Sequence, residues 1–185
     1  MIRWLVLLLG GVLLGGMIHL VTVLALPRLA TLDAYSRLQP VTRENAVTVL
    51  PATESDTALM PYMDPAFAVA ICRYDLGNGP IKLTVPVSQA YTSASFYTRN
   101  EVPYYAINDR SAGRRVIDLH LMTAAQHAEL PEDEDITAAD RLIIDSPTQT
   151  GLIVLKALAP EPGLMPQARA SLEAARCAIE TGPIR

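Results

Sequence analysis

The feature that most constrains this chain is an unbroken apolar run over Trp4–Leu26, in which His19 and Thr22 are the only polar residues. As an α-helix, this run would be about 34 Å long. That length is enough to cross the hydrocarbon core of a bilayer, which is about 30 Å thick. The sequence therefore predicts a transmembrane anchor over residues 1–26, in contact with the lipid bilayer.

A cleaved signal peptide is the alternative interpretation of the same run. The apolar part of a signal peptide is usually about 7–15 residues long, which is shorter than this run. Val23 and Ala25 do form a small-x-small pattern, so cleavage after Ala25 stays open as an alternative. The length of the run favours an anchor that is not cleaved.

The charges that flank the run bear on its orientation. Arg3 is the only charged side chain before it, whereas Arg28, Arg37 and Arg43 follow it. Counted alone, the three later arginines would keep the domain in the cytoplasm. A short cationic tail before a long apolar run is instead typical of a signal anchor, and two cysteines in the domain suit an oxidising compartment. We expect a single-pass protein of the bacterial inner membrane with a cytoplasmic N-terminus and a periplasmic domain.

Small and polar residues recur along one face of the predicted anchor. Gly11, Gly15 and His19 are spaced by four residues, and Thr22 follows three residues later. Small residues let two membrane helices approach closely, and a hydroxyl or imidazole can hydrogen-bond across the contact. The pattern predicts a helix–helix interface, with a second small membrane-anchored protein as the candidate partner. The alternative is chance, because glycine is common in membrane spans.

The rest of the chain has the size of one domain and an acidic balance. It carries 14 basic and 19 acidic residues, a net charge of about −5. This excludes a nucleic-acid-binding domain, which needs a basic surface. Polar and apolar residues are mixed over 27–45, which we interpret as a linker, and we expect the folded domain over 46–185.

Short apolar stretches separated by turn residues predict a mainly β domain, an antiparallel β-sandwich or jelly roll. Leu76–Pro80 carries a strong hairpin signal. Thr123–Gln126 has the spacing of a helix capping box. The expected strands are Ala46–Leu50, Phe67–Asp75, Ile81–Val87, Ser93–Thr98, Tyr104–Asn108, Val116–Leu121, Arg141–Asp145 and Leu152–Ala159.

A C-terminal helix is expected over about 166–181, between Pro166 and Gly182. Its wide arc of alanines would suit close packing on a sheet, and it would carry Cys177. One face of the strand Phe67–Asp75 carries alanines and Cys72. If the two surfaces face each other, Cys72 and Cys177 form a disulfide. The alternative is a pair of buried free thiols.

No segment carries a recognised catalytic, phosphate-binding or zinc-binding spacing, so no catalytic residue is identified and no metal or cofactor is expected. His120 and His127 are interpreted as ordinary surface histidines. The acidic run Glu132–Asp135 lacks the alternating ligands and the glycine of a calcium loop, and we interpret it as a solvated turn.

The most distinctive soluble segment is rich in tyrosine and arginine. Aromatic walls with convergent arginines can bind an organic anion, such as a phospholipid headgroup or an acidic metabolite. The alternative is a core hairpin with its polar tips in water. The candidate ligand-binding residues are Tyr97, Arg99, Tyr104, Tyr105, Arg110 and Arg114.

The order of several short segments resembles an uncharacterised bacterial family, domain of unknown function 1254, in its short membrane-anchored form. The resemblance implies a β-rich domain and a partner from a second uncharacterised family; it implies no activity. The segments are His19-Leu20-Val21-Thr22, Pro27-Arg28-Leu29, Asp64-Pro65-Ala66, Cys72-Arg73-Tyr74-Asp75, Phe96-Tyr97, Ala106-Ile107-Asn108-Asp109-Arg110, Ser146-Pro147-Thr148 and Gly151-Leu152-Ile153.

The function hypothesis from the sequence is a membrane-anchored envelope protein that works as a binding or interaction module. The rival hypothesis is an enzyme or ligand-binding protein that acts on an acidic or lipid-like small molecule at the membrane surface. A concave pocket lined by the tyrosines and arginines named above would favour the rival hypothesis.

Overall fold

The computed structural model covers residues 1–185 and divides into two compact units, residues 1–33 and 34–185. The residues that the structure describes are 1–29, 33–51, 60, 63–112, 115–130 and 142–180.

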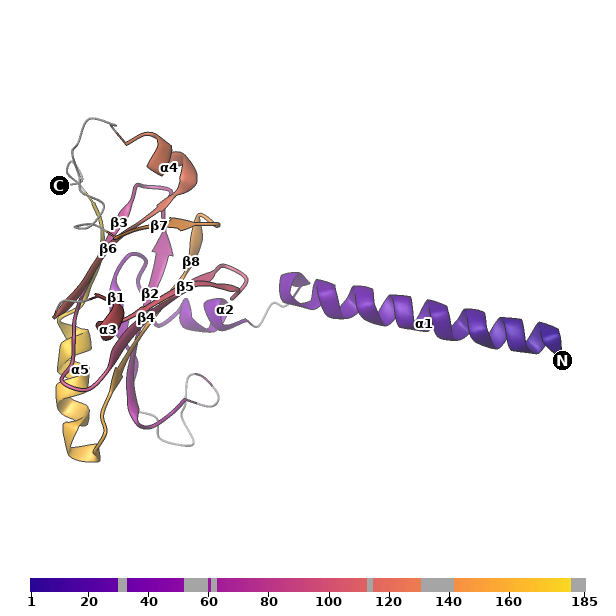
Figure 1. The fold of residues 1–185 in the computed structure, drawn as a ribbon, viewed down its shortest axis with the longest axis horizontal. Coiled ribbons are helices and arrows are strands. Elements are labelled where there is room, and N and C mark those ends of the chain that lie inside the picture. The colour runs from indigo at the N-terminus through magenta and orange to yellow at the C-terminus, as the bar shows by residue number, and fades with distance from the viewer. Residues whose placement is uncertain (30–32, 52–59, 61–62, 113–114, 131–141, 181–185) are drawn as a thin grey trace. The chain divides into compact units, whose positions relative to one another are not determined.

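The first unit contains helix α1 (Ile2–Leu29), within which Ile2–Leu26 is long and apolar enough to span a membrane (Figure 1). The hydroxyl of Thr22 donates to the carbonyl oxygen of Ile18 at 2.8 Å, so the helix itself satisfies this hydroxyl. A Cβ atom added at Gly11 or Gly15 would meet nothing within 4 Å. Packing within this chain therefore does not require glycine at either position.

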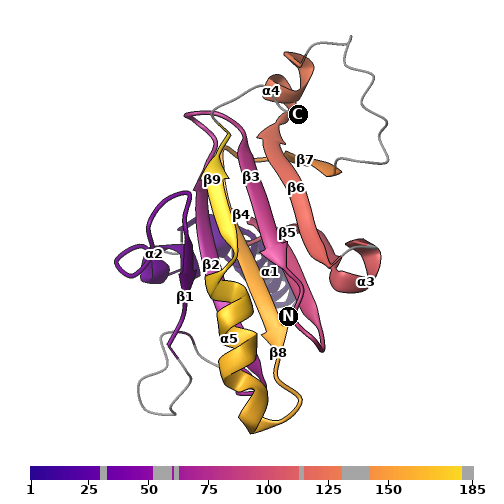
Figure 2. The same ribbon diagram turned by 90° about the vertical axis from the view of Figure 1, so that its left-hand side faces the viewer.

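The second unit is a sandwich of two β-sheets, which confirms the predicted mainly β fold (Figures 1 and 2). Neighbouring strands are antiparallel except for the parallel pair β6–β7. Sheet A has the order β1 (Val47–Val49), β2 (Phe67–Asp75), β8 (Thr150–Leu158), β4 (Thr92–Thr98) and β5 (Pro103–Asn108). Sheet B has the order β7 (Leu142–Ser146), β6 (Val116–Thr123), β3 (Ile81–Pro86) and β9 (Arg176–Ile179).

The main core lies between the two sheets because their strands turn apolar side chains inward at every second residue. In β3 and β4 the buried positions alternate strictly with partly exposed ones. Across sheet A, Cys72 is opposite Ile153, and Ile153 is opposite Phe96. All three side chains are fully buried. The expected strands agree with eight of the strands in the structure to within two residues at either end.

The turn signal at Leu76–Pro80 marks a real turn, but the predicted hairpin is wrong. β2 pairs with β1 and β8 in sheet A, whereas β3 pairs with β6 and β9 in sheet B. The segment therefore carries the chain from one sheet to the other, with Gly79 at a φ of 130°. Turn residues set the local change of direction, and long-range packing decides which strands pair.

The C-terminal helix exists but is shorter than expected. Helix α5 spans Met165–Glu173, and strand β9 follows it where the helix was expected to continue. β9 pairs with β3, which places Cys177 opposite Leu83. Edge pairing with sheet B therefore overrides the helical preference of the alanine-rich sequence. Figure 2 shows α5 and β9 in succession over the same side of sheet A.

Helix α5 covers part of the inner face of sheet A, as its alanines suggested. It contacts β2 and β8, and its Ala168 and Leu172 are buried in the main core. Small side chains on β2, Ala68 and Ala70, are buried in the same core. Small residues on both surfaces allow a helix to lie close to a sheet.

The structure joins Cys72 of β2 to Cys177 of β9 by a disulfide, with Cα atoms 6.5 Å apart. The pairing is the expected one, but Cys177 lies on a strand and not on a helix. The bond links sheet A to sheet B and closes a loop over 105 residues.

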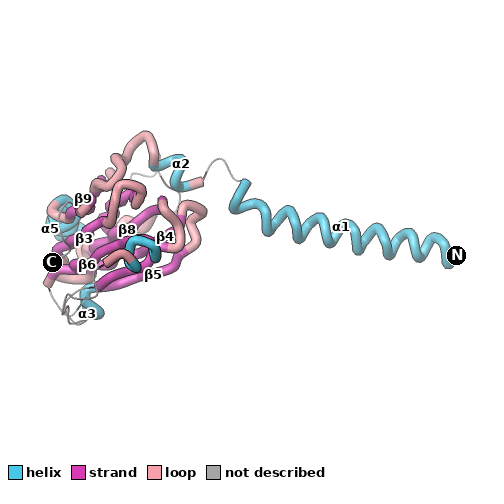
Figure 3. The backbone as a smooth tube through the Cα atoms, turned by 90° about the horizontal axis from the view of Figure 1, so that it is seen from above, coloured by secondary structure: helices cyan, strands magenta, loops and turns pink. Residues whose placement is uncertain are grey.

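The interpretation of residues 27–45 as a linker is wrong for its second half. Helix α2 (Ala34–Leu38) belongs to the domain, and its Tyr35 and Leu38 are buried. Residues 39–45 follow it along the domain, and Glu44 forms a β-bridge with Arg73 of β2. Figure 3 shows α2 and α5 on different sides of the strands. The sequence signal was too short to reveal α2, which depends on tertiary contacts.

Candidate functional site

The structure does not bring the predicted tyrosine and arginine residues into one pocket. Tyr97 lies on the outer face of sheet A, where it packs against a small apolar cluster. Tyr104 and Tyr105 lie on the edge strand β5, with ring centroids 6.2 and 5.8 Å from that of Phe96. Arg110 is exposed in the short helix α3 (Asp109–Ala112) at the other end of β5. Arg114 lies outside the described residues.

Tyr104 instead takes part in a cluster of hydroxyl groups. The Tyr74 hydroxyl lies 3.2 Å from that of Tyr104 and 2.9 Å from that of Ser146. Burial raises the pKa of the Tyr104 phenol, and the hydrogen bond with Ser146 opposes this rise. The cluster joins β2, β5 and β7, and we interpret it as structural.

Gly151 has a clear structural role beside this cluster. A Cβ atom at this position would collide with the backbone oxygen of Tyr97 and the phenol of Tyr74. The ring of Tyr74 therefore lies directly over β8 only because residue 151 has no side chain.

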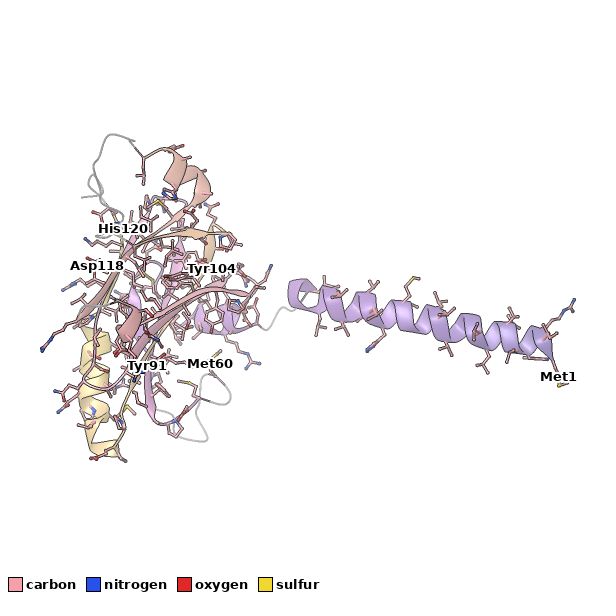
Figure 4. The ribbon with its side chains drawn as sticks, in the orientation of Figure 1. Met1, Met60, Tyr91, Tyr104, Asp118 and His120 are labelled. Carbon is pink, nitrogen blue, oxygen red and sulfur yellow. A yellow bond between two sulfur atoms is a disulfide. The ribbon has the colours of Figure 1, made fainter. Side chains whose placement is uncertain are left out.

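The outer face of sheet A, on the side away from the main core, contains an apolar groove of about 380 Å³. Val69, Ile71, Leu152 and Val154, on the neighbouring strands β2 and β8, form its floor. The walls are formed by Leu38 of α2 and by Leu50, Met60, Met63, Phe67 and Tyr97. Figure 4 shows Met60 on the α2 side of the sandwich, and Asp118 and His120 on the side of sheet B.

Among the residues that the structure describes, three charged side chains line this groove. Lys156 is exposed, and its ammonium lies 5.9 Å from the centroid of the Phe67 ring. The Asp64 carboxylate accepts a hydrogen bond from the backbone N–H of Ala66 at 2.9 Å. The Glu101 carboxylate accepts hydrogen bonds from the backbone of α2. Lys156 is therefore the one cation among the described residues that line the groove.

The groove is closed at one end by α2, which is held on sheet A through Tyr35. The Arg99 guanidinium lies 4.0 Å from the centroid of the Tyr35 ring, and that of Arg73 lies 5.5 Å from it. Arg73 also donates to the Tyr35 hydroxyl at 3.4 Å. Glu101 accepts from the N–H groups of Ala34 and Tyr35. We call Tyr35, Arg73, Arg99 and Glu101 the Tyr35 clamp.

Arg73 is a buried cation whose charge is compensated. Its Nη1 donates to Glu44 Oε1 at 2.7 Å, and its Nε donates to Thr42 Oγ1 at 3.4 Å. Burial by itself lowers the pKa of the guanidinium, but the hydrogen bonds to Tyr35 and Glu44 outweigh burial and raise this pKa. Arg73 therefore stays charged and ties the 34–45 segment to β2.

Among the described residues, neither His120 nor His127 forms a recognisable catalytic arrangement. His120 is buried on β6, so its interpretation as a surface histidine is wrong, whereas His127 is exposed and pairs with Asp145 at 2.9 Å. Within the described ranges, no group of three or more His, Cys, Asp or Glu side chains is placed to hold a metal ion. The acidic run Glu132–Asp135 lies outside the described residues.

A family model described as "Protein of unknown function (DUF1254)" matches residues 44–178, which is most of the chain. The chain belongs to the DUF1254 family. The resemblance found from the sequence segments is therefore confirmed. No curated protein matches the chain.

Of two solved structures that match this DUF1254 protein, the first shares its fold. The VPA0106 protein from Vibrio parahaemolyticus has a TM-score of 0.57 and 11% identity, over 82% of this chain and 37% of that one. A putative uncharacterized protein from Burkholderia cenocepacia has a TM-score of 0.44 and 11% identity, over 70% of this chain and 37% of that one. This chain thus spans little more than a third of the length of either protein.

Sequence reasoning missed the groove and the Tyr35 clamp of this DUF1254 protein, although one signal was present. The strand 67–75 is apolar on both faces, with Phe67, Val69 and Ile71 on one and alanines and Cys72 on the other. A strand of this kind is usually covered on both sides. The expected disulfide accounted for one face only, and the second apolar face is the floor of the groove.

Proposed function

We propose that this protein is a single-pass, membrane-anchored binding module of the bacterial envelope whose groove holds the hydrocarbon chain of an acidic, lipid-like molecule. The observation that carries the proposal is the apolar groove on the outer face of sheet A. Its volume of about 380 Å³ lies within the range of small-molecule sites, which is about 300–1,000 Å³.

The chemistry of the groove favours a hydrocarbon chain over a polar ligand. Its floor consists of aliphatic side chains from two paired strands, and its walls add two methionines and two aromatic rings. Methionine side chains adapt readily to a flexible apolar ligand. Burial contributes about 0.8 kcal/mol for each methylene group.

The charges at the groove favour an acidic head group on that chain. Asp64 and Glu101 already accept backbone hydrogen bonds, whereas the ammonium of Lys156 is exposed. A carboxylate or phosphate next to Lys156 would gain a charge-assisted hydrogen bond. This replaces the six-residue site expected from the sequence with a different site on the same domain.

The position along the chain favours a ligand that comes from the membrane. Ala34 lines the groove, and only four residues separate it from the end of α1 at Leu29. The anchor we propose is uncleaved, with its N-terminus in the cytoplasm. The disulfide supports a periplasmic domain because such bonds persist in oxidising compartments.

Photocrosslinking in nanodiscs tests the groove. Full-length protein is exposed to a fatty acid that carries a photoreactive diazirine on its chain, and the modified peptides are identified by mass spectrometry. We expect modification of the outer-face residues of β2 and β8. Val154→Phe should lower the yield at subsaturating probe about fifteenfold, because lost burial of two methylene groups costs about 1.6 kcal/mol.

Val116→Phe is the matched control, because Val116 is an exposed valine on sheet B. It should leave the crosslinking yield unchanged. Crosslinks confined to α1, or equal losses in both variants, would refute the groove as the binding site.

A second candidate function is association with a small membrane-anchored partner through α1. The supporting observation is that neither Gly11 nor Gly15 is needed for contacts within this chain. Replacing both with leucine should weaken co-purification of a partner anchor, because leucine blocks close approach. Leu13→Ala, on the opposite side of the helix from His19 and Thr22, should have no effect. Unchanged co-purification in the double variant would exclude this interface.

A further inference from the structure

We infer that the end of the domain that carries α2 and the β4–β5 turn is a lipid-contacting surface, held against the bilayer by the short connection to the anchor. The inference rests on the anchored state proposed above, and it does not depend on a ligand in the groove. The lipid-contacting patch consists of Arg37, Val41, Arg43 and Val102.

Helix α2 is fixed on the domain. The Tyr35 ring lies 4.0 Å from the Arg99 guanidinium, and the N–H groups of Ala34 and Tyr35 donate to the Glu101 carboxylate. Tyr35 and Leu38 are both buried. The residue at which the chain enters the domain is therefore joined to the β4–β5 turn, and it cannot move away without breaking these contacts and exposing Tyr35 and Leu38.

The connection between α1 and α2 is short. Leu29 ends α1 and Ala34 begins α2, so five Cα–Cα steps join them. Fully extended, five steps span at most about 18 Å. The headgroup region on one side of a bilayer is about 5–8 Å thick. The connection therefore allows the start of α2 to lie at most about 18 Å from the end of α1.

Exposed apolar side chains lie around α2. Val102 follows Glu101 in the β4–β5 turn and is 56% exposed, and Val41 follows α2 and is 44% exposed. Together with Val116, they are the large exposed hydrophobics among the described residues of the domain. Two of these three valines therefore flank the helix that is tethered to the anchor.

Two exposed cations accompany these valines. Arg37 is on α2, and Arg43 lies two residues beyond Val41. Arginine next to apolar side chains suits the membrane interface, where the aliphatic part lies among acyl chains and the guanidinium meets phosphates. The nearby Glu44 and Glu101 are engaged by Arg73 and by the α2 backbone. The local chemistry is thus opposite to the acidic balance of the whole domain.

Site-directed labelling tests this inference in the full-length protein. Val102→Cys carries an environment-sensitive fluorophore, and Val116→Cys on sheet B is the matched position. Because Cys72 and Cys177 are joined, only the introduced thiol reacts. The protein is placed in nanodiscs of phosphatidylcholine and phosphatidylglycerol that contain lipid with a nitroxide on its headgroup. We expect the label at 102 to lose most of its fluorescence and the label at 116 to keep most of it.

A charge placed in the patch provides the second measurement. Val41→Asp should restore much of the fluorescence of the label at 102, because a carboxylate is disfavoured at the lipid surface. Val116→Asp, a substitution of the same kind at a similarly exposed valine, should leave it unchanged. Equal quenching at 102 and 116, or equal effects of the two aspartates, would overturn the inference. The crosslinking experiment tests the proposed groove independently of this inference.

Discussion

Glu101 holds the backbone of Tyr35: its carboxylate accepts the Tyr35 N–H at 3.3 Å and also bonds the N–H of Ala34. Glu101 does so from a left-handed backbone conformation, with a φ of 62°. A residue with a Cβ atom is strained there by roughly 1–2 kcal/mol. Glutamate at this position therefore has a strained backbone, but its carboxylate attaches α2 to the domain.

Glu101→Gly separates these two effects. Glycine relieves the backbone strain, while loss of the carboxylate leaves two N–H groups of α2 without their acceptor. We expect the overall free energy of unfolding to change by less than about 1 kcal/mol, since the two effects oppose each other. Hydrogen exchange at Ala34 and Tyr35 should accelerate roughly fivefold or more. Unchanged protection of these two amides would show that Glu101 does not hold α2.

Gly151→Ala should be among the most damaging single-methyl substitutions in the domain. The added Cβ would collide with the Tyr97 backbone and the Tyr74 phenol, and neither can move freely. We expect a loss of about 3 kcal/mol or more in the free energy of unfolding, measured by denaturant titration. Gly163→Ala is the control, because a Cβ there meets nothing within 4 Å. Similar stabilities for the two variants would contradict the close approach of Tyr74 to β8.

Protein taken from native membranes without reductant should contain no alkylatable thiol. Replacing Cys72 and Cys177 together with alanine should lower the free energy of unfolding by about 2–5 kcal/mol, because a long loop is released in the unfolded chain. Mass spectrometry after alkylation and denaturant titration provide the two measurements. Two alkylated cysteines in the native protein would contradict both the bond and the periplasmic assignment.

The stability of the domain should fall in alkali, partly through Tyr104. Burial raises the pKa of this phenol in the folded state above its unfolded value near 10. A raised folded pKa means that the stabilisation is complete below the unfolded pKa and is lost as the pH rises above it. Tyr104→Phe should therefore flatten the decline in unfolding midpoint above about pH 10. An equally steep decline in this variant would assign the effect to other groups.

The amino-acid sequence alone determined those features that depend on neighbouring residues. Alternation of apolar and polar residues located the strands, as in Ile81–Pro86, where buried and partly exposed positions alternate. The capping box is present in the structure: Thr123 caps α4 (Ala124–Ala128), and Gln126 returns a hydrogen bond to its backbone. The apolar helix α1 is another such local feature, because length and hydropathy suffice to define it.

Only the tertiary structure decided which of these elements meet. Residues 76–80 join two different sheets, and residues 176–179 form a strand. Helix α2 depends on the packing of Tyr35 on the domain. The groove likewise depends on β2 and β8, which are distant in sequence and paired in space. Local preferences amount to a few tenths of a kcal/mol per residue, and burial against distant partners amounts to several, so the distant contacts prevail.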